Sequence, residues 1–266
     1  MSNWKTFETE CCSYLNRTFG NENIRFEVDG GSDSTSSDIK TYVEETNKFN
    51  IEVKSAVAQS GQFVVLNENG KLIFSPRNKS DENEAKPFLD YMNDHYEMYA
   101  TPTTAGEELE MDSNEYNKWI IDHYEQKNEK FVITGDSLGF VIFPTDKYGE
   151  YFDTTCNYRI KGSGTGSVAK KDAKVVQALF KAKSHRYEPK DDKKYYYYYL
   201  SGCTGYKRGD SEKSGKYSYY VSQVLPSGEM LITRKSNTRN ANVIFTIKLK
   251  KKQAPEDIAK FKEALE

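Results

Sequence analysis

Ser37-Asp38-Ile39, followed after a short polar segment by Ile51-Glu52-Val53-Lys54, is the stretch from which both fold and chemistry are predicted. Successive side chains of a β-strand point to opposite faces, so Glu52 and Lys54 project together. The apolar residues beside them then anchor the other face in the core. A preceding strand, joined by a short connection, brings Asp38 alongside. The pattern predicts a mixed sheet that carries two acids and one lysine close together.

This grouping has a chemical interpretation and a structural one. The carboxylates of Asp38 and Glu52 form the kind of oxygen site that Mg²⁺ prefers while it keeps several waters. Such a metal polarises a phosphate and lowers the pKa of a bound water, and Lys54 is suited to orient or deprotonate that water. The structural interpretation is a solvated strand face with a local ion pair, because short motifs of this kind often match by chance.

Around this stretch the hydrophobic pattern alternates between helical and strand-like segments. Helices are expected at residues 4–19, 84–99, 113–127, 172–182 and 255–265. Strands are expected at residues 24–28, 38–43, 49–57, 62–66, 72–75, 131–134, 140–143, 158–161, 195–200, 217–224, 230–234 and 243–249. Asn69-Gly70 is a strong hairpin signal. Because no repeating βα rhythm appears, we expect an α/β fold of the mixed α+β kind.

Composition supports a folded protein that does not span a membrane. Aromatic residues make up 14% of the 266 residues, so a real core is possible despite a hydrophobic fraction of only 36%. Apolar runs such as residues 63–66 are too short to cross a bilayer, and the N-terminus lacks the apolar stretch of a signal peptide. The four cysteines form no C-x-x-C pair and are expected to be reduced thiols. We expect a cytoplasmic protein with one domain over residues 1–266, although this length also fits a core with a smaller lobe.

The charges divide unevenly along the chain. Residues 1–156 hold 14 Lys+Arg against 29 Asp+Glu, whereas residues 157–252 hold 22 against 7. Such asymmetry indicates a polyanionic partner for the second half. The alternative is that the two halves neutralise each other inside one fold.

Asp38 followed by Glu52-x-Lys54 resembles the PD-(D/E)XK nuclease signature, with Ser37 where that superfamily often has proline. Further blocks, in the same order along the chain, resemble the HhaI-type restriction endonucleases. They are Trp4-Lys5-x-Phe7-Glu8, Ser32-Asp33-Ser34-Thr35-x-Ser37-Asp38-Ile39, Gly61-Gln62-Phe63-Val64, Ser75-Pro76-x-Asn78-Lys79-Ser80, Cys156-x-Tyr158-Arg159-Ile160-Lys161-x-Ser163-Gly164 and Asn240-Ala241-Asn242-Val243-Ile244-Phe245. The resemblance runs from residue 4 to about 247 and is weak over residues 167–232.

The resemblance implies a type II restriction endonuclease of the bacterial cytoplasm. Such an enzyme cleaves double-stranded DNA at a short palindrome, here GCGC, depends on Mg²⁺, and has a companion DNA methyltransferase that protects host DNA. It implies a restriction-endonuclease-like core in which helices flank a central mixed sheet. It also implies that Asp38 and Glu52 bind the metal together with the Val53 carbonyl, and that Lys54 is catalytic.

Two further residues are candidates for this site. Many members of the superfamily place a helix glutamate there, and Glu8 is the candidate, although it could equally be a solvated helix residue. Gln62 follows the catalytic strand. It is suited to hold DNA or a metal-bound water, or simply to bond a neighbouring strand.

The basic second half is expected to supply most of the grip on DNA, while residues 1–156 supply catalysis. Arginine can bridge guanine O6 and N7, asparagine can pair with adenine, and both can bind phosphates. Some of the candidates are expected to be ordinary loop residues. The DNA-binding candidates are Lys79, Arg159, Lys161, Ser163, Arg234, Lys235, Asn237, Arg239, Asn240 and Asn242.

Other interpretations are weaker. Gly162-x-Gly164-x-Gly166 lacks the Gly-Lys-Ser/Thr ending of a phosphate loop, so no nucleotide cofactor is expected. His95, His123 and His185 lie far apart in sequence and do not form a zinc motif. The alternatives that stay open are another PD-(D/E)XK nuclease, acting in repair or junction resolution, and a DNA-binding protein without catalysis.

Overall fold

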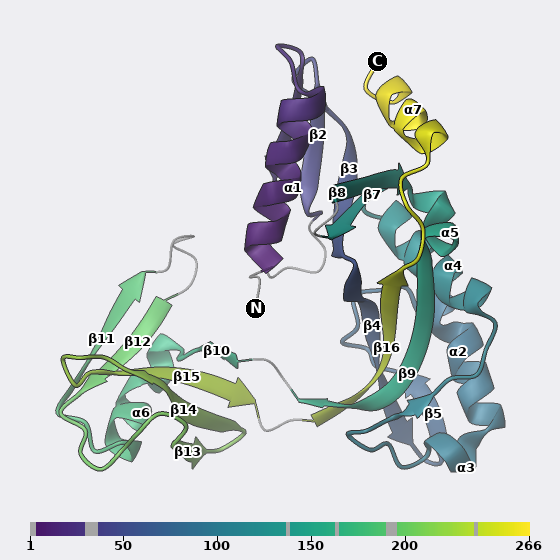
Figure 1. Ribbon diagram of the computed structural model, residues 1–266. Coiled ribbons are helices and arrows are strands. Elements are labelled where there is room, and N and C mark those ends of the chain that lie inside the picture. Colours follow the sequence, from purple (N-terminus) through teal and green to yellow (C-terminus); the bar gives the residue numbers. More distant parts are fainter. Residues whose placement is uncertain (1–3, 30–36, 137–138, 163–164, 190–195, 237–238) are drawn as a thin grey trace. The chain divides into compact units, whose positions relative to one another are not determined.

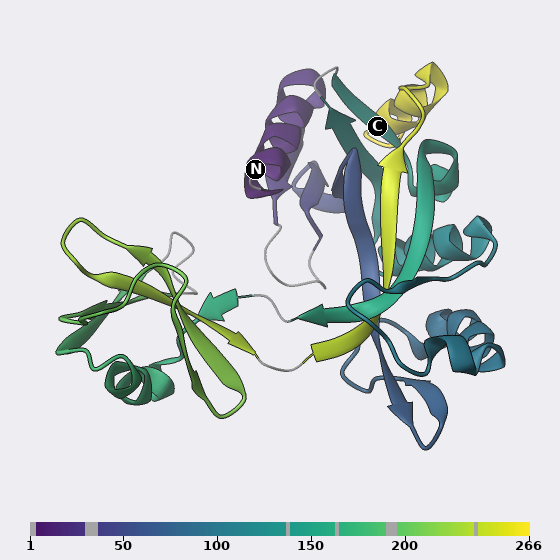
Figure 2. The same ribbon diagram turned by 60° about the horizontal axis from the view of Figure 1, so that its bottom comes forward.

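The structure is a computed structural model that describes residues 4–29, 37–136, 139–162, 165–189, 196–236 and 239–266. The chain forms two compact units, one of Met1–Arg159 with Ala241–Glu266 and one of Ile160–Asn240. Figures 1 and 2 show the elements of each unit from two sides. No helix within these described ranges is long and apolar enough to cross a membrane.

The first sheet of the larger unit is the predicted mixed sheet. Its order is β1-β2-β3-β7-β8, and β3 and β7 are parallel whereas the other neighbouring pairs are antiparallel. Its elements are β1 (Ile24–Val28), β2 (Ile39–Val43), β3 (Thr46–Ser55), β7 (Glu129–Asp136) and β8 (Gly139–Pro144). Helices α1 (Trp4–Phe19) and α7 (Pro255–Glu263) pack on it through Leu15 and Phe261, which belong to one buried cluster with Ile51 and Ile133.

A second sheet of the same unit has the order β5-β4-β16-β9-β6. Its strands are β4 (Val57–Glu68), β5 (Lys71–Phe74), β6 (Glu107–Glu108), β9 (Phe152–Gly162) and β16 (Arg239–Leu249). Its helices are α2 (Glu82–Asp94), α3 (Tyr96–Tyr99), α4 (Ser113–Glu125) and α5 (Tyr148–Tyr151). Large aromatic rings join α2 and α4 to this sheet, with Trp119 stacked on Phe245 at 4.5 Å between ring centroids. Only Ala56 separates β3 from β4, so the strand that carries Glu52 and Lys54 continues directly into the second sheet.

In its described residues the smaller unit is an antiparallel sheet that packs against one α-helix. Its strands follow the order β11-β12-β15-β14-β13, and β10 pairs with β15. Its elements are β10 (Thr165–Ser167), α6 (Ala173–Leu179), β11 (Ser184–Pro189), β12 (Tyr196–Ser201), β13 (Ser211–Ser214), β14 (Tyr217–Val224) and β15 (Met230–Ser236). Val176 and Phe180 bury against Tyr198, Leu200 and Ile232 in a core of its own.

The charge contrast follows the two units. Ile160–Asn240 holds 17 Lys+Arg against 7 Asp+Glu, and the rest of the chain holds 21 against 33. The assignment of one domain with functional halves at residues 1–156 and 157–252 stays a prediction.

The mixed α+β class is confirmed, and several element bounds are corrected. The expected helix over residues 84–99 is two helices, because His95 leaves helical geometry at φ −113° and ψ 36°. The expected strand over residues 49–57 ends at Ser55, and Val57 begins the next strand. The segment around Gly166 contains strand β10, which the sequence did not predict. All four cysteines are free thiols, as expected.

Asparagine side chains cap the edge strands of two sheets. Asn93 of α2 accepts from the Leu72 N–H at 2.8 Å and donates to the Leu72 carbonyl at 2.9 Å. Asn16 of α1 makes the same pair of bonds to Phe26 of β1. An unpaired edge is a template for aggregation, and an amide can satisfy both backbone groups at once.

We expect Asn93→Ala to destabilise the larger unit by about 1–3 kcal/mol, because Leu72 loses both partners at a buried position. Urea denaturation followed by tryptophan fluorescence measures the change. Asn83→Ala on the exposed face of the same helix is the matched control, with an expected change of about 0.5 kcal/mol or less. Equal losses for the two variants would show that the edge contact contributes nothing specific.

Candidate active site

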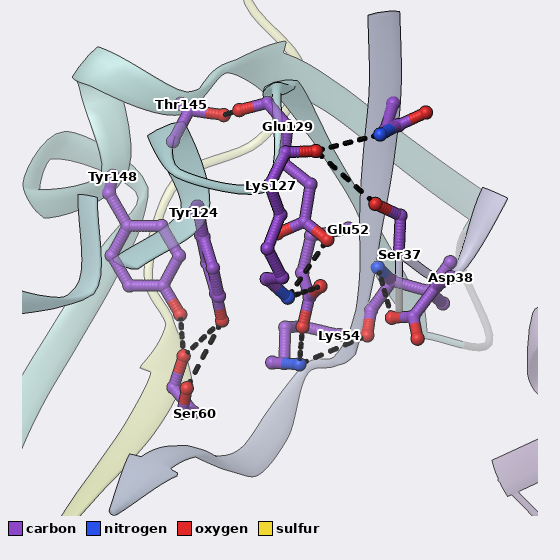
Figure 3. Close-up of polar contacts among 12 residues, drawn as sticks. Ser37, Asp38, Glu52, Lys54, Ser60, Tyr124, Lys127, Glu129, Thr145 and Tyr148 are labelled. Atoms are coloured by element: carbon purple, nitrogen blue, oxygen red, sulfur yellow. Dashed lines mark hydrogen bonds and ion pairs between the residues drawn. The ribbon is translucent and has the colours of Figure 1, made fainter. Parts of the chain in front are cut away.

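The register of β2 against β3 brings Asp38 beside the Glu52-x-Lys54 segment. Ile39 pairs with Ile51, so the residue just before β2 reaches the end of β3. An oxygen of the Asp38 carboxylate accepts a hydrogen bond from the Val53 N–H at 2.9 Å (Figure 3). The structure therefore places the three residues of the predicted motif together, as the sequence pattern indicated.

Glu52 lies between two lysines. Lys54 donates to Oε1 of Glu52, and the Lys127 Nζ lies 3.3 Å from Oε2 (Figure 3). The Lys54 ammonium also lies 3.5 Å from the Val53 carbonyl oxygen. Glu52 is only 5% exposed, so both ion pairs are shielded from bulk water.

Burial and neighbouring charges set the ionisation states of Asp38, Glu52 and Lys54. Burial and the nearby Glu52 raise the pKa of Asp38 to about 6. Burial alone would raise the pKa of Glu52, but Lys54 and Lys127 outweigh it and lower that pKa to about 2. Burial opposes the charge of Lys54, whereas Glu52 and Asp38 raise its pKa above the usual range. At neutral pH Glu52 is a carboxylate and Lys54 an ammonium, so Lys54 is a hydrogen-bond donor in this arrangement.

A third acid, Glu129, contacts Lys127. Its side chain is fully buried, and Oε1 lies 2.9 Å from the Lys127 Nζ. Burial and the charge of Glu52 raise the pKa of Glu129 to about 10, which keeps it neutral at pH 7. Sequence reasoning missed Lys127 and Glu129 because the parallel pairing of β3 with β7 brings them to the site. No local motif marks such a long-range contact.

Tyrosines support the lysines from one side. The Tyr124 ring centroid lies 5.1 Å from the Lys127 Nζ and 5.7 Å from the Lys54 Nζ, within cation–π range. Its hydroxyl bonds to Ser60 Oγ at 2.7 Å, and Tyr148 bonds to the same oxygen (Figure 3). These contacts hold the aromatic wall of the site in place.

Asp38, Glu52 and Lys54 line a cavity of about 540 Å³. The predicted Gln62 and Lys79 also line it, as do Arg77 and His123, which were not predicted. Gln62 accepts a hydrogen bond from Gln59 at 3.0 Å. A Cβ at Gly61 would lie 2.4 Å from the Trp119 ring, so this position needs glycine. The cavity therefore adds cationic and amide groups to the two acids.

Glu8 is buried on α1, the helix that packs against β1 and β3. The pKa of the neighbouring Cys11 is raised by burial first, and the charges of Asp38 and Glu8 both add to that effect. A role for Glu8 in the site stays a prediction.

The DNA-binding candidates outside the cavity lie on three strands. Arg159 and Lys161 are on β9, Arg234 and Lys235 on β15, and Arg239, Asn240 and Asn242 on β16. Arg234 lies over the Tyr217 ring at 4.3 Å and 3.5 Å from a carboxylate oxygen of Asp172. Asn242 is only 3% exposed, so its side chain faces the protein in this state. Ser163 and Asn237 lie outside the described residues.

No protein-family model and no curated protein sequence matches the chain. Among solved structures it is similar to HhaI endonuclease in complex with DNA, with 32% sequence identity and a TM-score of 0.78. The match covers 99% of this chain and 99% of that chain, so it extends over both units and the candidate site. The chain therefore belongs to the HhaI endonuclease family of restriction endonucleases.

Proposed function

We propose that the chain cuts double-stranded DNA by Mg²⁺-dependent hydrolysis of a phosphodiester bond at a short palindrome, GCGC. The observation that carries this proposal is the cluster of Asp38, Glu52 and Lys54 in one cavity. It occurs in a chain whose relative was solved as an endonuclease in complex with DNA.

The donor atoms of the site suit Mg²⁺. Asp38 and Glu52 supply carboxylate oxygens, and Val53 supplies a carbonyl oxygen. The Lys54 ammonium already reaches both Glu52 and the Val53 carbonyl, so this corner accommodates a cation. Within the described residues no three His, Cys, Asp or Glu side chains form a closed cage. Magnesium commonly binds through one or two carboxylates and keeps waters, and when bound it polarises the phosphate and acidifies a water.

The residues of the chain then divide the remaining work. Lys54, as an ammonium, orients the attacking water and stabilises the negative charge that grows on the phosphate oxygens. Arg77 and Lys79 line the same cavity and are suited to hold neighbouring phosphates. The Tyr124 ring lies against the ammonium groups of Lys54 and Lys127 and keeps them in place.

The smaller unit supplies a large part of the grip on DNA in this proposal. It holds 17 Lys+Arg against 7 Asp+Glu, and such a surplus of positive charge suits the binding of a polyanion. Arg234 and Lys235 are adjacent on β15, and an arginine already stacked on an aromatic ring is suited to read guanine. A companion methyltransferase that protects the same site completes the proposed system.

A plasmid of known sequence, digested in Mg²⁺ with its fragment ends sequenced, tests the proposal. We expect every end to map to GCGC. Ends at another palindrome would correct the site and keep the restriction activity. Cutting confined to junctions or damaged DNA would indicate a different PD-(D/E)XK nuclease, and binding without cutting would indicate a DNA-binding protein.

Asp38→Asn, Glu52→Gln and Lys54→Met are each expected to slow cleavage by ~10² or more, because each removes a charge needed near the reacting phosphate. Nicking of supercoiled plasmid measures the rate. Lys86→Met, on an exposed helix face, is the control and should cut at the wild-type rate. A near-wild-type rate for any of the three variants would remove that residue from the mechanism.

The salt dependence of binding separates phosphate contacts from base contacts. Lys161→Ala should weaken all duplexes alike and reduce the slope of log K against log salt by about one unit. Arg234→Ala should cost about 1–3 kcal/mol on the cognate duplex and little on a scrambled one. Fluorescence anisotropy at several salt concentrations measures both. A wild-type slope near zero would count against the basic unit as a DNA-binding surface.

A further inference from the structure

Lys127 lies outside the nuclease motif, yet hydrogen bonds to its backbone hold it beside the residues of that motif. Its carbonyl accepts hydrogen bonds from Asn50 Nδ2 at 2.7 Å and from Ser37 Oγ at 3.4 Å. The Asn50 N–H donates to the Asn128 carbonyl at 2.9 Å. The turn between α4 and β7 is thus tied both to β3 and to the residue that precedes Asp38.

The Lys127 side chain is also fixed. Its ammonium lies 3.3 Å from Glu52 Oε2, 2.9 Å from Glu129 Oε1 and 5.1 Å from the Tyr124 ring centroid (Figure 3). The side chain is 12% exposed, whereas lysines are mostly solvated. These three partners fix the position of the Lys127 ammonium within the site.

Cationic side chains outnumber acids along the cavity, because Arg77 and Lys79 line it as well. Asp38 and Glu52 are the two acids that line the cavity, and Lys54 and Lys127 line it with them. The two lysines occupy both oxygens of Glu52. A divalent cation that approaches Glu52 must therefore displace or tolerate two ammonium groups. Repulsion between cations a few ångströms apart is strong in a buried site.

We propose, on the basis of the proposed function, that Lys127 is an internal counter-cation that keeps the metal affinity of the DNA-free site low. Lys54 has a role in the reaction, whereas Lys127 sits on the far oxygen of Glu52 and adds positive charge. A DNA phosphate in the cavity supplies the negative charge that the cluster lacks. Metal binding, and with it hydrolysis, is thereby coupled to bound DNA.

Glu129 contacts the Lys127 ammonium and is neutral beside it, so position 129 is fixed as a neutral side chain in every test variant. Glu129→Gln is therefore the reference. Lys127→Met/Glu129→Gln removes the ammonium, and Lys127→Arg/Glu129→Gln retains a positive charge. Lys127→Gln/Glu129→Gln is a second neutral variant that keeps a hydrogen-bond donor for Glu52, in case the methionine variant does not fold. Circular dichroism and thermal melting establish that each variant is folded.

Mn²⁺ binding to the DNA-free chain, measured by electron paramagnetic resonance, is the readout and does not depend on cleavage. The neutral variant, Lys127→Met/Glu129→Gln or its glutamine counterpart, should bind Mn²⁺ about tenfold or more tightly than the Glu129→Gln reference. The variant that carries Lys127→Arg should match the reference. With a cognate duplex whose scissile phosphate is replaced by an uncleavable analogue, the difference should shrink. Equal or weaker Mn²⁺ binding by the neutral variant overturns the proposal.

A second comparison separates this inference from the proposed function. Glu52→Gln should weaken Mn²⁺ binding to the DNA complex. If it does, and the neutral Lys127 variant still binds no more tightly than the reference, only the role of Lys127 is wrong. If Glu52→Gln leaves Mn²⁺ binding to the complex unchanged, the metal site itself is wrong, and both proposals fail.

Discussion

Glu52 is a carboxylate with almost no access to water, and burying such a charge is costly unless opposite charges reach it. Lys54 and Lys127 provide those charges, one at each carboxylate oxygen, and their combined effect keeps Glu52 ionised. The arrangement fixes the positions of both lysines in return, since an ammonium at this depth also needs its partner. The geometry of the site therefore depends on this one buried ion triad, in which Glu52 is the shared member.

The fold places the triad by joining distant segments. The parallel pair β3 and β7 brings the end of the α4–β7 turn to Glu52, and β2 brings Asp38 to the Val53 N–H. Because β3 runs almost directly into β4, the same stretch of chain continues into the second sheet, whose residues line the cavity beside the acids. The absence of a side chain at Gly61 leaves room for the Trp119 ring that closes one wall. Glu52 and Lys54 are thus held on a paired strand, Asp38 directly before one, and Lys127 in the turn that leads into β7.

Period-two alternation was enough to predict that Glu52 and Lys54 share a face, and the short connection to Asp38 was enough to predict a neighbouring strand. Both depend on contacts close in sequence. Lys127 and Glu129 could not be found in this way, because they reach the site through a parallel pairing across about 75 residues, and loop length does not specify such a contact. The break at His95 was missed for a different reason. The apolar periodicity continues past His95, whereas the helical backbone conformation is interrupted there.

We propose that Asp38, Glu52 and the Val53 carbonyl hold a divalent metal beside a DNA phosphate. A crystal structure of the chain with a GCGC duplex and Ca²⁺, which fits carboxylate sites, tests this most directly. We expect a cation at about 2.3–2.6 Å from oxygens of all three residues, with the scissile phosphate against it and Lys54 within hydrogen-bond reach. A duplex whose scissile phosphate lies away from this cavity, or a cation held by other residues, would contradict it.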